Sequence, residues 1–432
     1  MKRLVFSVLG VFLSFSLPSI AKTSRLALSV NSEAAILMNA DTGAILFEKN
    51  AYELHYPASI TKIVTAICAL QKVGDRMEEQ IAADQECIGT MKEEAIRRSN
   101  YTVPAYTLIP DGSHIGIKKG EVLSLKDLMY GMMLASGDDA ANVIAKFSGG
   151  TIPNFVEEMN AFAKQAGSKS TTFYNPHGLH HPKQQTTAYD MAMITRQALK
   201  NPAFREIVST VSYTRPKTNK QEPTTLIQTN RLLRNGPYYY SKAIGVKTGY
   251  YSKAGSTLVA AAKDGDRTLI AVLMKAQERK DIFQDAKKMF EAAFSQPKVQ
   301  RVLLRQGPQK FTLELPGAKM PIPSYLKEEL VLEYYSAEEP NVKCLLSWEK
   351  KLKLPVAKDQ KIGELIVQTD NGTVLRTAPL YAQDAVDAGT WFRIKSNFSN
   401  GQTGRSLGKI AGAIALCTSL GYLLFYLRRR KR

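Results

Sequence analysis

The hydrophobic and polar positions between residues 34 and 294 follow a strand pattern at both ends and a helical pattern between them. Two apolar runs, residues 34–39 and 44–49, flank a turn that contains Gly43, which predicts a β-hairpin. Apolar residues at helical spacing then predict helices over residues 60–73, 125–147, 155–166 and 188–200. A second pair of strands, over 256–262 and 268–273, and a last helix, over 281–294, follow. This order predicts an α+β domain whose antiparallel sheet is built from both ends of the segment.

The pattern changes at about residue 297. Short β-patterned runs now alternate with proline and glycine turns, at residues 310–315, 330–335, 343–348 and 364–368. They predict a small all-β domain over residues 297–397. The glycine and serine residues of 398–409 indicate a short flexible stalk after it.

The N-terminal segment is typical of a secretory signal. Lys2 and Arg3 precede an apolar stretch over residues 4–17, and small residues follow up to Ala21. The apolar stretch is shorter than the roughly 20 residues that a membrane-spanning helix needs. We therefore expect residues 1–21 to be a signal peptide that is cleaved after Ala21, with the first domain over residues 22–296.

The C-terminal segment has a different pattern. Residues 410–427 carry no charge, and the basic residues 428–432 follow directly. This predicts a spanning helix of near-minimal length with a cytoplasmic tail. Together with the signal, this segment predicts that the folded domains lie outside the cytoplasm, on the periplasmic side of the plasma membrane. A single spanning helix would anchor them there.

Composition and charge narrow the classes of protein to which the chain can belong. The 432 residues, 44% of them hydrophobic, can bury the cores of two or three domains. Of the net charge of +19, two charges belong to the signal and five to the tail, which leaves +12 on the exported part. No nucleic-acid-binding motif accompanies this charge, and the four cysteines and five histidines show no metal-ligand spacing. We therefore expect no nucleic-acid partner, no metal and no cofactor.

A candidate nucleophile stands at the start of the first predicted helix. Ser59 and Lys62 form a Ser-x-x-Lys motif, whose spacing places the hydroxyl and the amine one turn apart on the same face. A serine hydroxyl is a weak nucleophile until a base takes its proton. Lysine can act as that base only if its pKa is lowered by burial or by another cation. This motif alone is weak evidence, because it is short.

Two further motifs follow in order. Ser136 and Asp138 end a predicted apolar helix in the sequence Ala-Ser-Gly-Asp, and Lys247-Thr248-Gly249 ends a strand-like run. Ser-x-x-Lys, a Ser-x-Asn-type motif and Lys-Thr-Gly in this order are the signature of penicillin-binding proteins and serine β-lactamases. The three motifs together are strong evidence for that superfamily.

The sequence around these motifs narrows the family. The stretches PASITKIVTA, DLMYGMM, FVEEMNAFAKQAG, NPHGL, TTAYD and GVKTGYYSKAGSTLVAAA closely resemble the low-molecular-mass D-alanyl-D-alanine carboxypeptidases of peptidase family S11, over about residues 33–295. The all-β segment fits that family's second domain, and KIGELIVQTDNGTVLRTAPLYA resembles the end of such a domain. The resemblance implies a serine enzyme with a penicillin-binding fold that removes the terminal D-alanine from peptidoglycan stem pentapeptides through an acyl-enzyme and is inhibited by β-lactams.

The resemblance also implies a role for each motif residue. Ser59 would be the acylated nucleophile, Lys62 its general base, and Ser136 the hydroxyl that relays a proton to the departing D-alanine. Lys247 would supply positive charge near the substrate carboxylate and help to lower the pKa of Lys62. Thr248 would donate a hydrogen bond to the same carboxylate.

Two neighbouring positions complete the expected substrate site. Gly249 would let the strand come close to the ligand, where a side chain would stand in the way. The backbone amides of Ser59 and Tyr250 would form the oxyanion hole, with two donors that face the developing negative charge.

The sequence departs from the family in two places. Asp138 stands where the family usually has asparagine, and a carboxylate there would favour the protonated form of Lys62. Either it points away, or acylation needs a higher pH, or the position tolerates both residues as a structural group. Residues 91–113 form an apparent insertion, which would restrict substrates, bind a partner or be a tolerated surface loop.

Other enzymes and inactive binding proteins share this fold. A class A β-lactamase needs an additional glutamate, but Glu157 and Glu158 lack the required spacing and are interpreted as the solvated face of a helix. Transpeptidases generally carry a larger N-terminal region. A D,D-endopeptidase or an inactive penicillin-binding scaffold of the cell wall remain alternatives, and Asp138 is the feature that favours an inactive protein.

Overall fold

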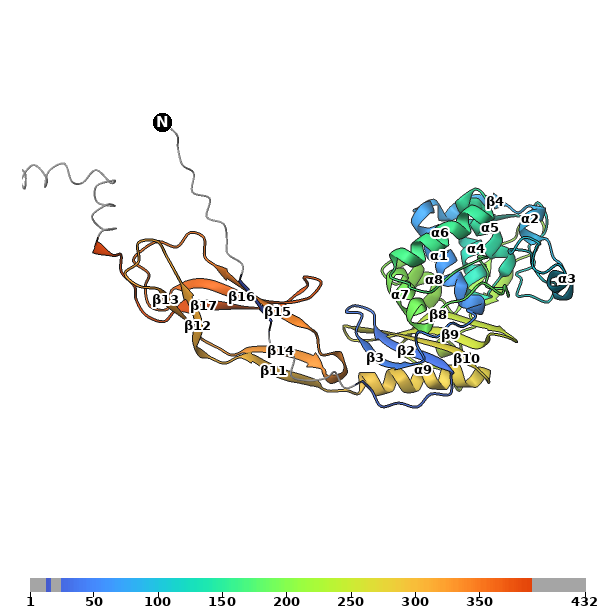
Figure 1. Cartoon of the computed structure of the whole chain (residues 1–432). Coiled ribbons are helices and arrows are strands. Elements are labelled where there is room, and N and C mark those ends of the chain that lie inside the picture. Colours follow the sequence, from blue (N-terminus) through green and yellow to red (C-terminus); the bar gives the residue numbers. More distant parts are fainter. Residues whose placement is uncertain (1–12, 17–24, 391–432) are drawn as a thin grey trace, which may run out of the picture. The chain divides into compact units, whose positions relative to one another are not determined.

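The computed structural model describes residues 13–16 and 25–390 (Figure 1). Most of the expected signal peptide, the stalk, the expected spanning helix and the tail lie outside the described residues. Among the described residues, no helix is both long and apolar enough to cross a membrane. The chain divides into two compact units, of which one comprises Thr23–Pro297 together with Tyr335–Glu339.

This first unit contains a five-stranded antiparallel sheet in the order β3-β2-β10-β9-β8. The strands are β2 (Ala34–Asn39), β3 (Ile45–Lys49), β8 (Ala243–Tyr251), β9 (Gly255–Asp264) and β10 (Arg267–Ala276). The hairpin and the strand pair that the sequence predicts lie side by side in it. The sheet is therefore built from both ends of the unit, as expected.

Both faces of this sheet are covered, so its inner strands are apolar on both sides rather than alternating. From β2, Ile36 and Met38 pack with the helices of one face, while Ala35 and Leu37 pack with α9 (Arg279–Phe294) on the other. Figure 1 shows α9 alone below the sheet and the remaining helices above it.

The helices above the sheet, with the break between α4 (Leu125–Leu134) and α5 (Asp138–Gly149), carry the first two motifs, and the third motif lies on β8. These helices are η1 (Ala58–Thr61), α1 (Lys62–Val73), α4, α5, α6 (Ile152–Gln165), α7 (Ala188–Ala198) and α8 (Pro202–Ser209). Side-chain caps fix several of their starts, including Thr151, Thr187 and Asn201, and Ser124 forms a capping box with Asp127. These caps determine where the helices begin and so where the loops between them lie.

The predicted single helix over 125–147 is wrong. It is two helices, α4 and α5, separated by the residues of the second motif. Ser136 has a φ of 67°, a left-handed conformation that no residue can adopt within an α-helix. The break moves the serine out of the helix and turns its hydroxyl toward the other motifs.

Shorter elements that the sequence pattern does not predict complete the unit. They are η2 (Arg76–Glu78), α2 (Gln85–Ile88), α3 (Glu93–Arg98), η3 (Arg231–Leu233) and two strand pairs, β4 (Gln80–Ala82) with β5 (Val122–Ser124) and β6 (Ser212–Arg215) with β7 (Thr224–Ile227). Each is too short to show a clear period.

The second unit is all-β, as the sequence predicts. Its strands are β11 (Lys298–Leu304), β12 (Gly307–Leu313), β13 (Ile322–Leu326), β14 (Leu330–Tyr335), β15 (Val342–Trp348), β16 (Lys361–Thr369) and β17 (Val374–Ala382). A sheet in the order β1-β15-β16-β17-β13-β12 forms most of it, and β11 pairs with β14. Strand β1 (Leu13–Ser16) comes from the expected signal peptide and pairs with β15.

One short segment of the β-rich sequence packs within the first unit. In Tyr335–Glu339, the carboxylate of Glu338 accepts hydrogen bonds from Asn39 (2.8 Å) and from the Nε of Arg267 (2.8 Å). Arg267 is buried, lies over the Tyr335 ring at 3.9 Å and donates to the Ala293 carbonyl (2.6 Å). Segment Tyr335–Glu339 thus compensates a buried charge of the first unit.

Candidate active site

The Ser-x-x-Lys motif lies on the turn η1 and the start of α1, as its spacing predicts. The Lys62 amine donates to the Ser59 hydroxyl at 3.0 Å. Lys62 is completely buried, whereas Ser59 is half-buried. The hydroxyl is therefore open to a ligand while the amine beside it is shielded from water.

Asp138 faces Lys62. Its Oδ1 lies 2.6 Å from the Lys62 amine, which also donates to the carbonyl oxygen of His177 at 2.6 Å. Burial lowers the pKa of Lys62, and the charges of Asp138 and Asp139 oppose this and raise it. The alternative in which the Asp138 side chain points away from Lys62 is therefore wrong.

A second pair of a hydroxyl and an amine lies beside the first. Lys247 on β8 donates to the Ser136 hydroxyl at 2.9 Å and to the carbonyl oxygen of Thr248 at 3.0 Å. Both side chains are buried. Burial, together with the charge of Lys62, lowers the pKa of Lys247 well below its usual value.

The two buried amines of this cluster do not have equivalent carboxylate partners. Asp138 is the carboxylate that contacts a lysine, while Asp139 accepts hydrogen bonds from the backbone amides of residues 115–117. A buried charge is costly unless it is paired. Lys247 has no carboxylate within ion-pair distance among the described residues, so its neutral form is favoured, in agreement with its lowered pKa.

Two glycines leave room for the turn that carries the nucleophile. A Cβ on Gly249 would lie 2.7 Å from the Ser59 nitrogen, and a Cβ on Gly178 would lie 2.0 Å from the Ala58 carbonyl oxygen. Next to Gly249, the Thr248 hydroxyl donates to the Thr229 hydroxyl at 2.9 Å. The structure thus brings the predicted residues of all three motifs to one place.

Comparisons with known proteins agree with this geometry. The sequence pattern of the D-alanyl-D-alanine carboxypeptidase family matches residues 21–278, and that of the penicillin-binding protein 5 C-terminal domain matches residues 316–388. The chain belongs to the D-alanyl-D-alanine carboxypeptidase family. It is a serine-type D-Ala-D-Ala carboxypeptidase of peptidoglycan and a penicillin-binding protein.

Individual relatives match along most of their length. D-alanyl-D-alanine carboxypeptidase DacF of Bacillus subtilis is 33% identical over 404 residues, which are 89% of this chain and 94% of the relative. Penicillin-binding protein 5 from Haemophilus influenzae has a similar structure, with a TM-score of 0.57 and 26% identity over 84% of this chain and all of the other.

A Streptomyces DD-transpeptidase also resembles the carboxypeptidase, with a TM-score of 0.53 and 28% identity over 62% of this chain and 98% of the other.

Residues 91–113 of the carboxypeptidase lie against the active site. The Tyr106 carbonyl accepts from Asn142 (2.9 Å), the Ser113 carbonyl accepts from the Asp138 amide (2.6 Å), and Gly112 is so close that a Cβ there would lie 2.9 Å from Asp138 Oδ2. The segment also contains the short helix α3.

The same segment forms a pocket with the loops after His177 and after β8. Its lining includes Tyr101, Pro104, His180, Tyr251 and Lys253. The His180 ring contacts the Tyr101 ring, with 5.7 Å between centroids, and bonds to the Tyr251 hydroxyl at 3.3 Å. Sequence reasoning missed this pocket, because its aromatic residues come from three separate segments.

The two glutamates of α6 and the described cysteines have no role in the active site. Glu158 pairs with Lys72 on the surface at 2.7 Å and Glu157 is exposed, as expected for the solvated face of a helix. Cys68, Cys87 and Cys344 are buried free thiols, and Cys417 lies outside the described residues.

Proposed function

We propose that the carboxypeptidase reaction begins at Ser59. Its oxygen attacks the carbonyl of the penultimate D-alanine while Lys62 takes the hydroxyl proton. The C–N bond then breaks, the amine of the terminal D-alanine receives a proton through Ser136, and water hydrolyses the resulting ester. The observation that carries this proposal is the pair of hydrogen bonds at 3.0 Å and 2.9 Å that joins each serine to a buried lysine.

Substrate charge would help to prepare the base. The terminal carboxylate of a stem peptide, placed at Lys247 and Thr248, would give Lys247 the carboxylate partner that it lacks among the described residues. It favours an ammonium on Lys247, and this charge disfavours a second ammonium on Lys62, since like charges lower each other's pKa. Substrate binding would thus favour the neutral Lys62 that the reaction needs.

The oxyanion would be held by backbone amides of Ser59 and Tyr250. Gly249, which precedes Tyr250, lies against the Ser59 nitrogen. The Tyr250 side chain is 65% exposed, so the proposal concerns its backbone. Donors fixed at this point stabilise the charge of the tetrahedral intermediate. In a β-lactam the same attack opens the ring, and the acyl group stays on Ser59.

The direct test uses a pentapeptide that ends in D-Ala-D-Ala. The wild type should release D-alanine, and the same preparation should be labelled by a fluorescent penicillin. Labelling without release of D-alanine would instead support a penicillin-binding scaffold.

Asp138→Asn should speed acylation near neutral pH. Asp138 raises the pKa of Lys62, and its removal leaves burial to lower that pKa further. More enzyme then holds Lys62 neutral, so the rise of the rate with pH moves to lower pH, and the rate near pH 7 increases by about tenfold or more. Penicillin acylation rates between about pH 6 and about pH 10 measure this shift.

The control for this variant is Glu158→Gln, which removes a carboxylate from the surface pair with Lys72. It should leave the profile unchanged. Superimposable profiles for the wild type and Asp138→Asn would mean that Asp138 holds a substrate amide or Ser136 in place and does not tune the base.

We also propose that the enzyme is exported and works at the outer face of the plasma membrane. The signal pattern over 1–21, the apolar segment 410–427 and the basic residues 428–432 support this. The family match begins at residue 21, next to the expected cleavage site.

Deleting the chain from Lys409 onward should release a soluble enzyme with unchanged penicillin acylation. The measurement is the distribution between membrane and supernatant after centrifugation. If the truncated protein still sediments with membranes after a high-salt wash, another surface is the anchor.

A further inference from the structure

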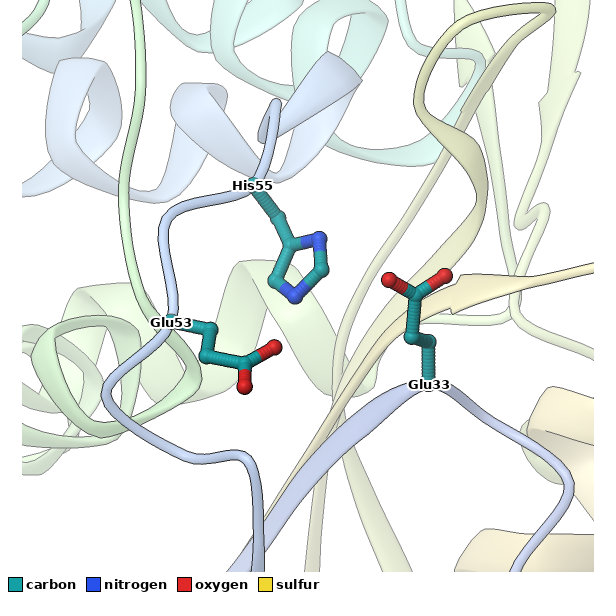
Figure 2. A group of neighbouring side chains, drawn as sticks. All are labelled: Glu33, Glu53 and His55. Carbon is teal, nitrogen blue, oxygen red and sulfur yellow. The ribbon is translucent and has the colours of Figure 1, made fainter.

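Three side chains that could ligate a metal converge outside the active site. Glu33 precedes β2, while Glu53 and His55 lie on the segment between β3 and η1 (Figure 2). One ligand atom from each lies within 4.8 Å of the others. A hairpin separates Glu33 from the other two in the sequence, so no spacing motif reveals the group.

His55 supplies an independent observation. His55 is only 7% exposed, and its Nε2 is buried without a hydrogen-bond partner. Figure 2 shows a ring nitrogen of His55 facing the gap between the two carboxylates. An unpaired buried nitrogen is costly. A ligand in this gap would remove that cost.

The backbone around His55 is held in place. Its amide donates to the Thr186 carbonyl at 2.8 Å, and its carbonyl accepts from the Thr186 amide at 2.9 Å. A neutral imidazole nitrogen has a lone pair that it can donate to a metal ion.

We propose that Glu33, Glu53 and His55 bind a divalent transition-metal ion such as zinc. One imidazole nitrogen and two carboxylate oxygens are a ligand set that zinc accepts, with water in the fourth position. The nitrogen ligand disfavours calcium and magnesium, which prefer oxygen alone. Glu33 is half-exposed and Glu53 is exposed, so both side chains have room to move onto the ion.

Lys275 is the competing cation. Its amine lies 3.0 Å from the Glu33 carboxylate, and both side chains are about two-fifths exposed, at 41% and 39%. An ion pair this exposed contributes little to stability. A divalent ion held by three ligands should therefore displace it, and removing the lysine charge should strengthen metal binding.

The ion would tie the start of the sheet to the segment that leads to the nucleophile, since His55 stands four positions before Ser59. Its role would be to hold this segment in place and not to take part in the chemistry at Ser59. An ion that binds only the folded protein also raises the melting temperature.

The test is a zinc titration of the full chain in detergent after treatment with a chelator, in competition with a chromophoric chelator. We expect one zinc per chain. His55→Gln, Glu33→Gln and Glu53→Gln should each weaken binding by about tenfold or more and lose the zinc-dependent rise in melting temperature. Lys275→Gln should tighten binding.

The matched controls are His181→Gln and Glu157→Gln, which remove a histidine and a glutamate elsewhere. They should bind zinc like the wild type. The glutamine variants keep the size of the exposed glutamates, so their metal-free melting temperatures should match the wild type and exclude misfolding. No zinc binding in the wild type, or equal affinity in the wild type and all three ligand variants, overturns the proposal.

Discussion

Ser59→Ala should abolish both penicillin labelling and release of D-alanine, with a loss of roughly 10⁴-fold or more, the scale seen when a catalytic serine is removed. The reason is that the Ser59 hydroxyl is the one that contacts Lys62 among the described hydrogen bonds, whereas the Ser136 hydroxyl contacts Lys247. The fold should be kept, since Ser59 is half-buried and Lys62 retains Asp138 and the His177 carbonyl as partners.

Mass spectrometry of the penicillin-treated wild type should place the adduct on the peptide that contains Ser59. Ser209→Ala is the control, because Ser209 is an exposed serine whose hydroxyl bonds only to the Glu206 carbonyl among its described contacts. It should be labelled normally. An adduct on another peptide, or undiminished labelling of Ser59→Ala, would refute the assignment of the nucleophile.

Gly178→Ala should reduce the acylation rate by about 100-fold or more. Gly178 has a φ of 95°, and a Cβ there would lie 2.0 Å from the Ala58 carbonyl oxygen and 3.1 Å from the Ser59 nitrogen. The alanine can be accommodated only if the nucleophile turn moves. A displacement of about 1 Å at a catalytic group can cost about 100-fold in rate.

Gly150→Ala separates this clash from simple backbone strain. Gly150 has a φ of 75° with no atom within 4 Å of its Cβ position. Its variant should lose about 1 kcal/mol of stability and keep the wild-type acylation rate. Acylation and thermal unfolding of both variants should be compared, and a normal rate for Gly178→Ala would show that the turn tolerates the displacement.

Much of the fold follows from local sequence patterns. The helices α1, α6, α7 and α9 have strong apolar periods, and the strands of the main sheet are continuous apolar runs. The sequence predicts both with small errors at the ends. The helix over 125–147 is the exception, because its apolar period continues across Ser136 although the backbone does not. An apolar period indicates which side chains are buried. It does not indicate that one residue within it, here Ser136, has a positive φ.

The active site is predictable for a different reason. Ser59, Lys62, Ser136 and Lys247 stand in short motifs whose order alone indicates that they meet. The direction of Asp138 and the contact of Lys62 with the His177 carbonyl could not be predicted, because they depend on how loops distant in sequence pack. The cluster of Glu33, Glu53 and His55 has no motif for the same reason.

The position of Glu338 limits how the enzyme can be divided. A fragment that stops at Pro297 would keep every catalytic motif but lose the carboxylate that pairs with the buried Arg267. Removing one partner of a buried ion pair costs about 3–5 kcal/mol, a large part of the stability of an ordinary domain. The catalytic unit is thus discontinuous in sequence, and the linker to the β-rich unit is not a point at which one cut yields an intact enzyme.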